Sequence, residues 1–317
     1  MQYIASKPIV PYIARALMSS LTNHIKLLRP KDWAKNLFLF VPSFFAEKFF
    51  DTENLLRLTV AFFAFSFMAS CIYILNDYRD IADDQKHPVK KNRPLASGKV
   101  KKTTALALSI LLFIASAIIG YLLDGTLQFL FVLSLYFMLN VAYSLGFKNI
   151  AILDILILAA GFVLRVKGGA VIAKVDTSEW LIIMTYLLAL FLSIAKRRDD
   201  LILKIETGSD MRKSMTGYNL EFLGTMLAFF SAIIIVSYIM YTVSGQTYVR
   251  LRTHRLYYTS VFVIAGILRY LQITFVQKKS GSPTEILYKD RFIQCTIILW
   301  ILSIYGILYL RDKTFFA

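Results

Sequence analysis

Nine stretches of this 317-residue chain are apolar and long enough to cross a lipid bilayer as helices. A bilayer core of about 30 Å needs about 20 apolar residues in a helix. The chain is 57% hydrophobic and 18% charged, whereas soluble domains carry about 25% charged residues. We therefore predict an all-α integral membrane protein. The expected spans are 33–50, 55–76, 103–122, 126–145, 150–173, 178–195, 221–243, 257–277 and 291–310.

Positive charge is distributed unevenly between the two sides of these spans. The side of the N-terminus and of two long polar segments, 77–102 and 196–220, has 24 lysines and arginines, and the other side has 8. Cytoplasmic loops of membrane proteins are enriched in Lys and Arg. We therefore expect the N-terminus inside, the C-terminus outside, and both polar segments facing the cytoplasm from the inner (cytoplasmic) membrane.

The N-terminal segment, residues 1–32, is predicted to form an amphipathic helix on the membrane surface. Apolar side chains repeat there at helical spacing, namely Ile13, Leu17, Leu21, Ile25 and Leu28. No Gly/Ser linker, low-complexity tract or fixed repeat divides the remainder of the sequence. We therefore expect residues 33–317 to form a single transmembrane domain.

The first polar segment opens with carboxylates at helical spacing. Four side chains stand at positions i, i+1, i+4 and i+8, near one face of a helix: Asn76, Asp77, Asp80 and Asp84. Crowded carboxylates repel one another unless a cation neutralises them, and Mg²⁺ favours carboxylate oxygens together with substrate phosphates. We expect the three aspartates to bind Mg²⁺, and Asn76, Asp77 and Asp80 to be catalytic. The alternative, a solvated helix end, is disfavoured because acidic residues there oppose the helix dipole.

Cations that could bind substrate phosphates lie in both polar segments and within the spans. Lys and Arg suit phosphate oxygens that a metal leaves free. A charge inside an apolar span costs about 2.5–3.5 kcal/mol on insertion scales and usually faces the bundle interior. The expected phosphate-binding residues are Lys35, Lys90, Arg93, Lys148, Arg165, Lys196 and Arg197.

Three further features accompany these charges. Asp154 is expected to pair with an intramembrane cation such as Arg165 or Lys167. The glycine pair at 168–169 is expected to allow either a helix break or a close backbone approach. His87 is interpreted as structural, because phosphate chemistry has no obvious need of it.

The segment 76–98 resembles the Asn-Asp-x-x-Asp-x-x-x-Asp motif of the UbiA superfamily of intramembrane prenyltransferases. Members of that superfamily have nine transmembrane helices and a Mg²⁺-diphosphate site facing the cytoplasm. They normally carry a second aspartate-rich motif after the sixth helix. This sequence departs from that pattern, since the residues there read Lys196-Arg197-Arg198-Asp199-Asp200.

The departure resembles the branch of the superfamily called decaprenyl-phosphate phosphoribosyltransferase. The segment 28–36, LRPKDWAKN, and the extended motif 76–96 are also similar to that branch, and the likeness covers about 28–200. The resemblance implies transfer of 5-phosphoribose from phosphoribosyl pyrophosphate to a polyprenyl (decaprenyl-like) phosphate, with Mg²⁺ as cofactor and diphosphate as product. A cationic second motif would bind the 5-phosphate of this donor, which a carboxylate motif would repel.

Three other functions are weighed against this one. A prenyltransferase that moves an isoprenoid from an allylic diphosphate onto an aromatic ring is the runner-up, but it would want carboxylates instead of Lys196 and Arg197. A transporter would place its charges near the membrane midplane, whereas these gather at one face. Nucleic acid is not an expected partner, because the cations follow membrane topology. The sequence leaves open the prenyl chain length, the oligomeric state (a homo-oligomer included), and the roles of Asp83, Asp199 and Asp200.

Overall fold

The computed structural model of the chain describes residues 21–86, 89–208, 213–277, 286 and 288–310. Within these ranges every regular element is a helix, and eight helices are long and apolar enough to cross a membrane. Eight of the expected spans are therefore confirmed as helices. They are α3 (Thr52–Arg79), α5 (Lys102–Asp124), α6 (Gln128–Leu145), α7 (Leu153–Ala173), α8 (Glu179–Thr207), α9 (Leu220–Val243), the run η5 (Arg255–Thr259), α11 (Ser260–Gln272) and η6 (Ile273–Gln277), and α13 (Arg291–Tyr309).

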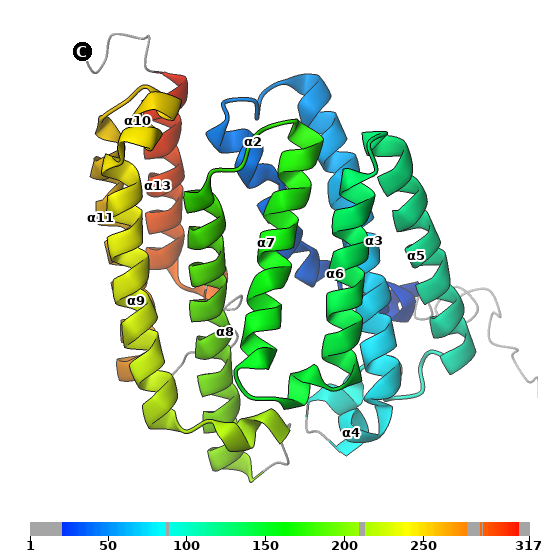
Figure 1. The fold of residues 1–317 in the computed structure, drawn as a ribbon. Helices are drawn as coiled ribbons and strands as arrows, with labels where there is room; N and C mark the ends of the chain where they lie inside the picture. Colours follow the sequence, from blue (N-terminus) through cyan, green and yellow to red (C-terminus); the bar gives the residue numbers. More distant parts are fainter. Residues whose placement is uncertain (1–20, 87–88, 209–212, 278–285, 287, 311–317) are drawn as a thin grey trace, which may run out of the picture.

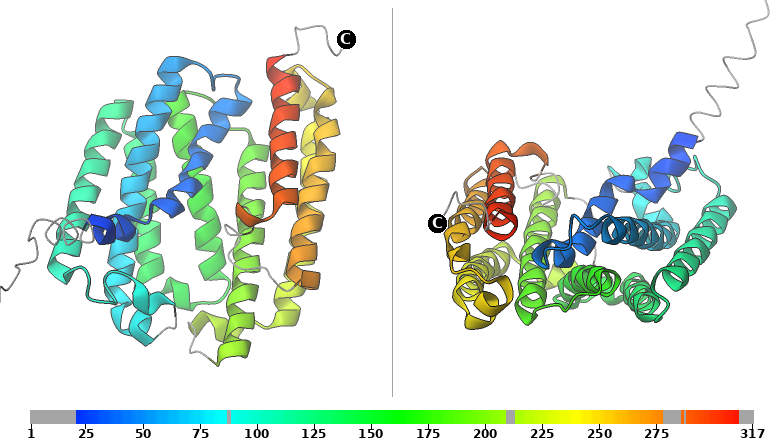
Figure 2. Two further views of the ribbon diagram at one scale, coloured as in Figure 1. Left: turned by 180° about the vertical axis from the view of Figure 1, so that it is seen from behind. Right: turned by 90° about the horizontal axis from the view of Figure 1, so that it is seen from above.

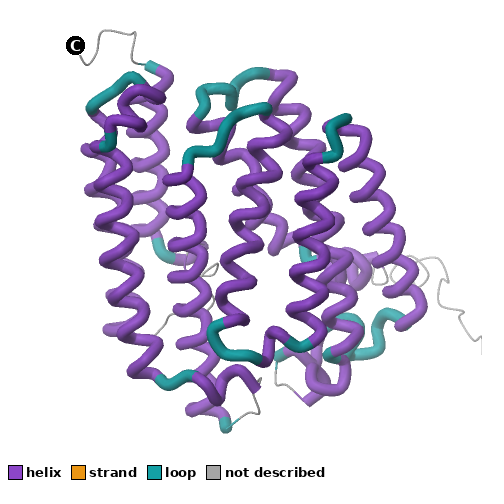
Figure 3. Tube along the Cα trace, viewed as in Figure 1, coloured by secondary structure: helices purple, strands orange, loops and turns teal. Residues whose placement is uncertain are grey.

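The long helices stand side by side (Figures 1 and 3). Helix α3 packs against α5, α6 and α7, and α7 packs against α8. Helix α8 packs against α9, α9 against α11, and α11 against α13. Four short elements, α4 (Ile81–Lys86), η2 (Lys90–Asn92), η3 (Phe147–Asn149) and η4 (Lys213–Gly217), connect long helices at one end of this bundle, which we call the α4 end. Helices α2 (Val41–Phe45) and α10 (Gly245–Leu251) lie at the opposite end.

The first predicted span, 33–50, is not one of the eight long helices. It consists of the 3-10 helix η1 (Pro30–Phe40), the short α2, and a turn. Pro42 lacks the N–H that a continuous α-helix needs in its interior, but it is tolerated in the first turn of α2. The chain therefore changes helix type where one continuous helix was expected, and the segment runs obliquely from the middle of the bundle to the end opposite α4 (Figure 2).

Helix η1 crosses α7 at the predicted glycine pair. A Cβ atom on Gly169 would collide with the backbone carbonyl of Leu39, and one on Gly168 would lie 3.2 Å from the Phe129 ring. Helix α7 runs unbroken through both glycines. Of the two expectations for this pair, the close backbone approach is therefore confirmed. Leu39 and Phe129 belong to one buried apolar cluster that fixes η1 against α3, α6 and α7.

The described part of the N-terminal segment is a helix over residues 21–28 that lies across the bundle axis (Figure 2). Leu27 is buried in an apolar cluster with residues of α3 and α5. Leu21 and Ile25, from the expected apolar face, are exposed on the protein surface. Two further members of that face, Ile13 and Leu17, lie outside the described residues.

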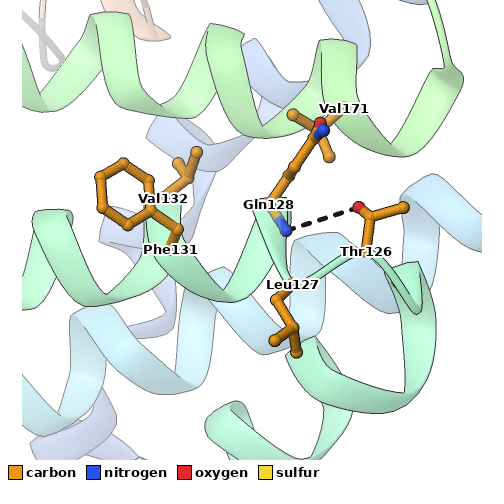
Figure 4. A pocket seen from close by; sticks show the side chains of 6 residues that line it. All are labelled: Thr126, Leu127, Gln128, Phe131, Val132 and Val171. Atoms are coloured by element: carbon orange, nitrogen blue, oxygen red, sulfur yellow. Dashed lines mark hydrogen bonds between the residues drawn. The ribbon is translucent and has the colours of Figure 1, made fainter.

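A mostly apolar hollow of about 460 Å³ lies at the turn between α5 and α6, at the end opposite α4 (Figure 4). Its lining carries no ionisable group. It therefore lies away from the charged residues singled out in the sequence. The lining residues are Thr126, Leu127, Gln128, Phe131, Val132 and Val171.

Gly169→Ala is expected to destabilise the protein by about 1–3 kcal/mol, because the added methyl group overpacks the contact with Leu39. Thermal unfolding in detergent measures the effect. Gly306→Ala is the matched control, since a Cβ there meets nothing within 4 Å. Equal melting temperatures for the two variants would contradict the close approach of η1 to α7.

Candidate active site

The predicted acidic helix breaks in two at Asp80. Helix α3 ends at Arg79, Asp80 is its C-cap residue, and α4 begins at Ile81. Asp84 therefore lies on a separate short helix, where it stands in the favourable first turn. The expectation that all four polar side chains share one helix face is wrong, because it assumed that the helix continues.

Asp77 and Asp84 are brought together by one guanidinium group. Nη1 of Arg93 lies 3.0 Å from Asp77 Oδ1 and 2.8 Å from Asp84 Oδ2. Arg29 forms a second ion pair with Asp77 Oδ1, and its guanidinium lies over the Tyr73 ring. The two carboxylates are only 2% and 4% exposed. Their burial makes these cations necessary, because an uncompensated buried charge is strongly destabilising.

Burial raises the pKa of the Asp84 carboxyl above its ordinary value, and the charge of Arg93 opposes the shift. The charge of Lys90 also lowers the pKa of the Asp84 carboxyl. Two of the expected phosphate-binding residues, Lys90 and Arg93, therefore lie beside this carboxylate. His87, from the same segment, lies outside the described residues.

Sequence reasoning misses Arg29 as a site residue. It lies before the first expected span, and no repeated pattern marks it. Its backbone has a φ of 53°, in the left-handed region that a bulky side chain rarely adopts, and Pro30 follows it. Two signals were available: the segment 28–36, which includes Arg29, and the Arg-Pro step at the entry to η1, because a proline restricts the residue before it.

Asp80 has partners different from those of the other two carboxylates and binds Lys148. The Lys148 Nζ lies 2.6 and 2.8 Å from the two Asp80 oxygens and 3.4 Å from Asn76 Oδ1. Asn76 donates to Asp80 Oδ2 at 3.1 Å and accepts a hydrogen bond from the Ser144 hydroxyl at 3.3 Å. Lys148 lies on η3, so this contact joins the end of α3 to the loop between α6 and α7.

Arg197 in the second polar segment is buried, and each of its three nitrogens has a protein partner. Nε donates to Asp154 Oδ2 at 2.6 Å and Nη1 donates to Asp200 Oδ2 at 2.8 Å. Nη2 donates to the Tyr143 hydroxyl at 3.3 Å. Its neighbour Lys196 is exposed, and its charge acts on Asp32 of η1. The two cations of this motif therefore have different surroundings.

The predicted partners of Asp154 are wrong. Its carboxylate is fully buried and accepts hydrogen bonds from Arg197 and from the Tyr218 hydroxyl, each at 2.6 Å. Arg165 lies three turns further along α7, about 16 Å away along the helix axis, and Lys167 donates to Thr177 in the loop beyond α7. Asp154 therefore meets Arg197 within α8, a contact that sequence spacing could not reveal.

Arg165, an expected phosphate-binding residue, fixes η1 to α6 and α7. It is 4% exposed and donates to Asn36 Oδ1 at 2.7 Å, to the Tyr136 hydroxyl at 2.9 Å and to the Gly161 carbonyl at 2.7 Å. Its guanidinium also lies 4.8 Å from the centre of the Tyr136 ring. The guanidinium of Arg165 therefore has hydrogen-bond partners within the protein. Lys35, another of the expected phosphate-binding residues, forms an ion pair with Asp32 at 2.6 Å.

Adjacent residues of α6 join the two polar segments. Tyr143 accepts from Arg197, and Ser144 donates to Asn76 while its carbonyl accepts from Arg79. The acidic end of α3 and Arg197 of α8 therefore both contact the last turn of α6. This arrangement could bind an anionic substrate between a carboxylate group and a cationic group. Helix α8 continues to Thr207, so the expectation that Lys196 and Arg197 follow the end of the span 178–195 is wrong.

The donor set was tested for a metal site. Among the residues that the structure describes, no three His, Cys, Asp or Glu side chains are grouped closely enough to hold a metal ion. Asp77 and Asp84 do share one Arg93 nitrogen, so both carboxylates can reach a single cation. Mg²⁺ is commonly held by one or two carboxylates together with substrate phosphates and water. The pair Asp77 and Asp84 fits such a site, whereas Asp80 is engaged by Lys148.

The eight spans and the charged site at one end of the bundle define a multi-pass membrane protein with a polar site at one end of its helices. Residues 37–296 match the UbiA prenyltransferase family, and the chain belongs to that family.

Known relatives agree with this assignment. The chain is 32% identical over 295 residues to the decaprenyl-phosphate phosphoribosyltransferase of Mycolicibacterium smegmatis, covering 90% of this chain and 92% of that protein. It is 28% identical over 296 residues to the protein of the same name from Corynebacterium glutamicum, covering 90% and 86%. Its fold resembles a UbiA homologue from Archaeoglobus fulgidus bound to DMAPP and Mg²⁺, with a TM-score of 0.67, 18% identity, and coverage of 91% and 99%.

Arg197→Met is expected to destabilise the protein by about 3–5 kcal/mol, because it leaves the buried carboxylate of Asp154 without its cation. Lys196→Met is the adjacent control and should change stability by less than about 0.5 kcal/mol, since that side chain is exposed. Unfolding in detergent distinguishes the two variants. Equal destabilisation would contradict the structural role assigned to Arg197.

Proposed function

We propose that this chain transfers 5-phosphoribose from phosphoribosyl pyrophosphate to a polyprenyl phosphate and releases diphosphate. The names of its relatives, at 28–32% identity over about 90% of the chain, support this activity. The observation that carries the proposal is the exposed Lys196, whose charge acts on Asp32 of η1, the segment that Arg29 of the acidic cluster precedes. An allylic diphosphate offers no third phosphate for that cation.

The two polar segments have complementary roles in this proposal. Lys196 binds the 5-phosphate of the donor, which a carboxylate would repel. Arg93 and Lys148, which neutralise the aspartates, bind oxygens of the donor diphosphate. Asn76 orients Asp80 and Lys148. Arg197 and Arg165 hold these groups in place through their buried contacts.

Asp77 and Asp84 would hold Mg²⁺, with Asp80 beside them. When bound, Mg²⁺ supplies charge neutralisation for the departing diphosphate. The magnesium reported with the Archaeoglobus homologue supports a divalent cation in this family. In this proposal Mg²⁺ replaces the guanidinium of Arg93 between Asp77 and Asp84. Arg93 then becomes available to bind phosphate oxygens of the donor.

The chemical step needs positioning more than acid–base catalysis. An oxygen of the polyprenyl phosphate attacks C1 of the ribose, and the bond from C1 to the diphosphate oxygen breaks with its electron pair. The nucleophile is already an anion, so no strong base is required. Fixed cations stabilise the charge that develops on the leaving group. Lys35, paired with Asp32 on η1, is placed to bind the acceptor phosphate.

The membrane arrangement forms part of the proposal. Helices η1 and α2 run obliquely along the bundle to the end opposite α4, and with the preceding chain they would provide a ninth, broken crossing. The positive-inside rule then places the N-terminus and the α4 end in the cytoplasm and the C-terminus outside. The helix over 21–28 would lie in the inner-membrane interface with Leu21 and Ile25 toward lipid.

Donor choice tests the proposal directly. Purified protein with Mg²⁺ and polyprenyl phosphate is offered phosphoribosyl pyrophosphate, and separately an allylic diphosphate with an aromatic acid. Mass spectrometry of the lipids should reveal a phosphoribosyl lipid that disappears with chelator. A prenylated aromatic product alone would overturn the proposed substrate.

Lys196→Met is expected to raise the KM for phosphoribosyl pyrophosphate at least tenfold, because a charged hydrogen bond to phosphate contributes about 1.5–3 kcal/mol. Lys204→Met, two turns further along α8, serves as the control and should leave the KM within twofold. An unchanged KM in the Lys196 variant would remove the proposed 5-phosphate site.

Asp77→Asn is expected to abolish turnover and to lower the melting temperature in detergent, while the protein still folds because Arg29 and Arg93 remain partly exposed to water. The substitution keeps the shape of the side chain but removes the charge that would hold the metal. Turnover near that of the unmodified protein would contradict the metal-site proposal.

A further inference from the structure

Beside the two polar segments, the turn between η3 and α7 is held in a strained conformation. Ile152 has a φ of 70°, a value that a β-branched residue rarely adopts. Such strain costs of the order of 1–3 kcal/mol and persists only where surrounding contacts enforce it. The turn connects Lys148, which binds Asp80, to Asp154, which binds Arg197. Its conformation therefore sets the relative positions of the two halves of the site.

The contacts that enforce this turn come from Tyr218, just before α9. The Tyr218 hydroxyl accepts from the Ile152 backbone N–H at 2.6 Å and donates to Asp154 Oδ1 at 2.6 Å. Burial and the bond to Asp154 raise the pKa of this hydroxyl, so it stays protonated and able to donate.

The neighbouring Gly217 allows the same approach. A Cβ atom at Gly217 would lie 2.5 Å from the Cβ of Ala151, so the absence of a side chain lets η4 pack directly onto the turn. Two adjacent residues of one segment thus fit the strained turn in different ways, one by hydrogen bonding and one by close packing.

We propose that Tyr218 is a positioning residue, which holds the 150–154 turn so that Lys148 and the Lys196-Arg197 motif are aligned for one donor molecule. This inference rests on the proposed function. Tyr218 acts through Asp154, which bonds Arg197, and through the turn that follows Lys148.

The expected consequence is a change in donor binding. Lys148 and Lys196 contact phosphates both before and during the reaction, so misalignment weakens ground state and transition state alike. Loss of such uniform binding raises KM with little change in kcat. Tyr218→Phe removes only the hydroxyl and should raise the KM for phosphoribosyl pyrophosphate about tenfold, with kcat within threefold.

The matched control is Tyr238→Phe. Tyr238 is also buried, and its hydroxyl also has two partners, Thr259 at 2.7 Å and Trp300 at 2.8 Å, but it lies on α9 away from the turn. This variant should lose comparable thermal stability and keep the donor KM. Gly217→Ala, which presses on Ala151, is the second test variant and should raise the donor KM as Tyr218→Phe does.

The outcomes separate the inference from the function on which it rests. If the unmodified protein does not transfer phosphoribose, the proposed function fails. If it does, and the folded Tyr218 or Gly217 variant keeps its donor KM within twofold, the positioning role is overturned. A KM that rises equally in the Tyr238 control also overturns it, because the effect would then follow general stability. A Tyr218 variant that does not fold leaves Gly217→Ala to decide.

Discussion

The buried ion pair between Arg197 and Asp154 is the interaction on which the polar site depends. Neither side chain has access to water, so each needs the other to offset the cost of burying its charge. The pair connects α8, at Arg197, to the start of α7, and Tyr143 connects it to α6. Removing one partner would leave an uncompensated charge where three helices meet. The positions of the surrounding polar groups follow from this junction.

Around that junction the acidic cluster at the end of α3 and the Lys196-Arg197 motif of α8 differ in how their charges are compensated. At the end of α3, aspartates are buried and their charges are held by Arg93, Arg29 and Lys148. In the proposed function, Arg93 and Lys148 exchange these carboxylates for phosphate oxygens of the donor. Within α8, Arg197 is fully engaged by the protein, and the exposed Lys196 is the proposed ligand of the 5-phosphate. On donor binding the cations at the end of α3 would therefore change partners, while Arg197 would keep the partners that it has in the free protein.

Sequence reasoning succeeded where the determining property is local. Eight spans could be predicted because each is a continuous run of apolar residues. The glycine pair in α7 also correctly indicated a close backbone approach. The ninth stretch differs because Pro42 and a 3-10 backbone interrupt it, which hydropathy does not register. Spacing could not reveal that Asp154 meets Arg197, since that contact depends on how α7 and α8 pack. Tyr218 gave no signal, because its role arises only when η4 reaches the strained turn.

A structure of the protein with Mg²⁺ and phosphoribosyl pyrophosphate bound is the most direct test of this account. We expect the 5-phosphate on Lys196 and the diphosphate on Lys148 and Arg93, with Arg197 still bonded to Asp154 and Tyr218 still on the Ile152 N–H. An Arg197 side chain that leaves Asp154 to bind a phosphate, or a donor bound away from the end of α3, would contradict it.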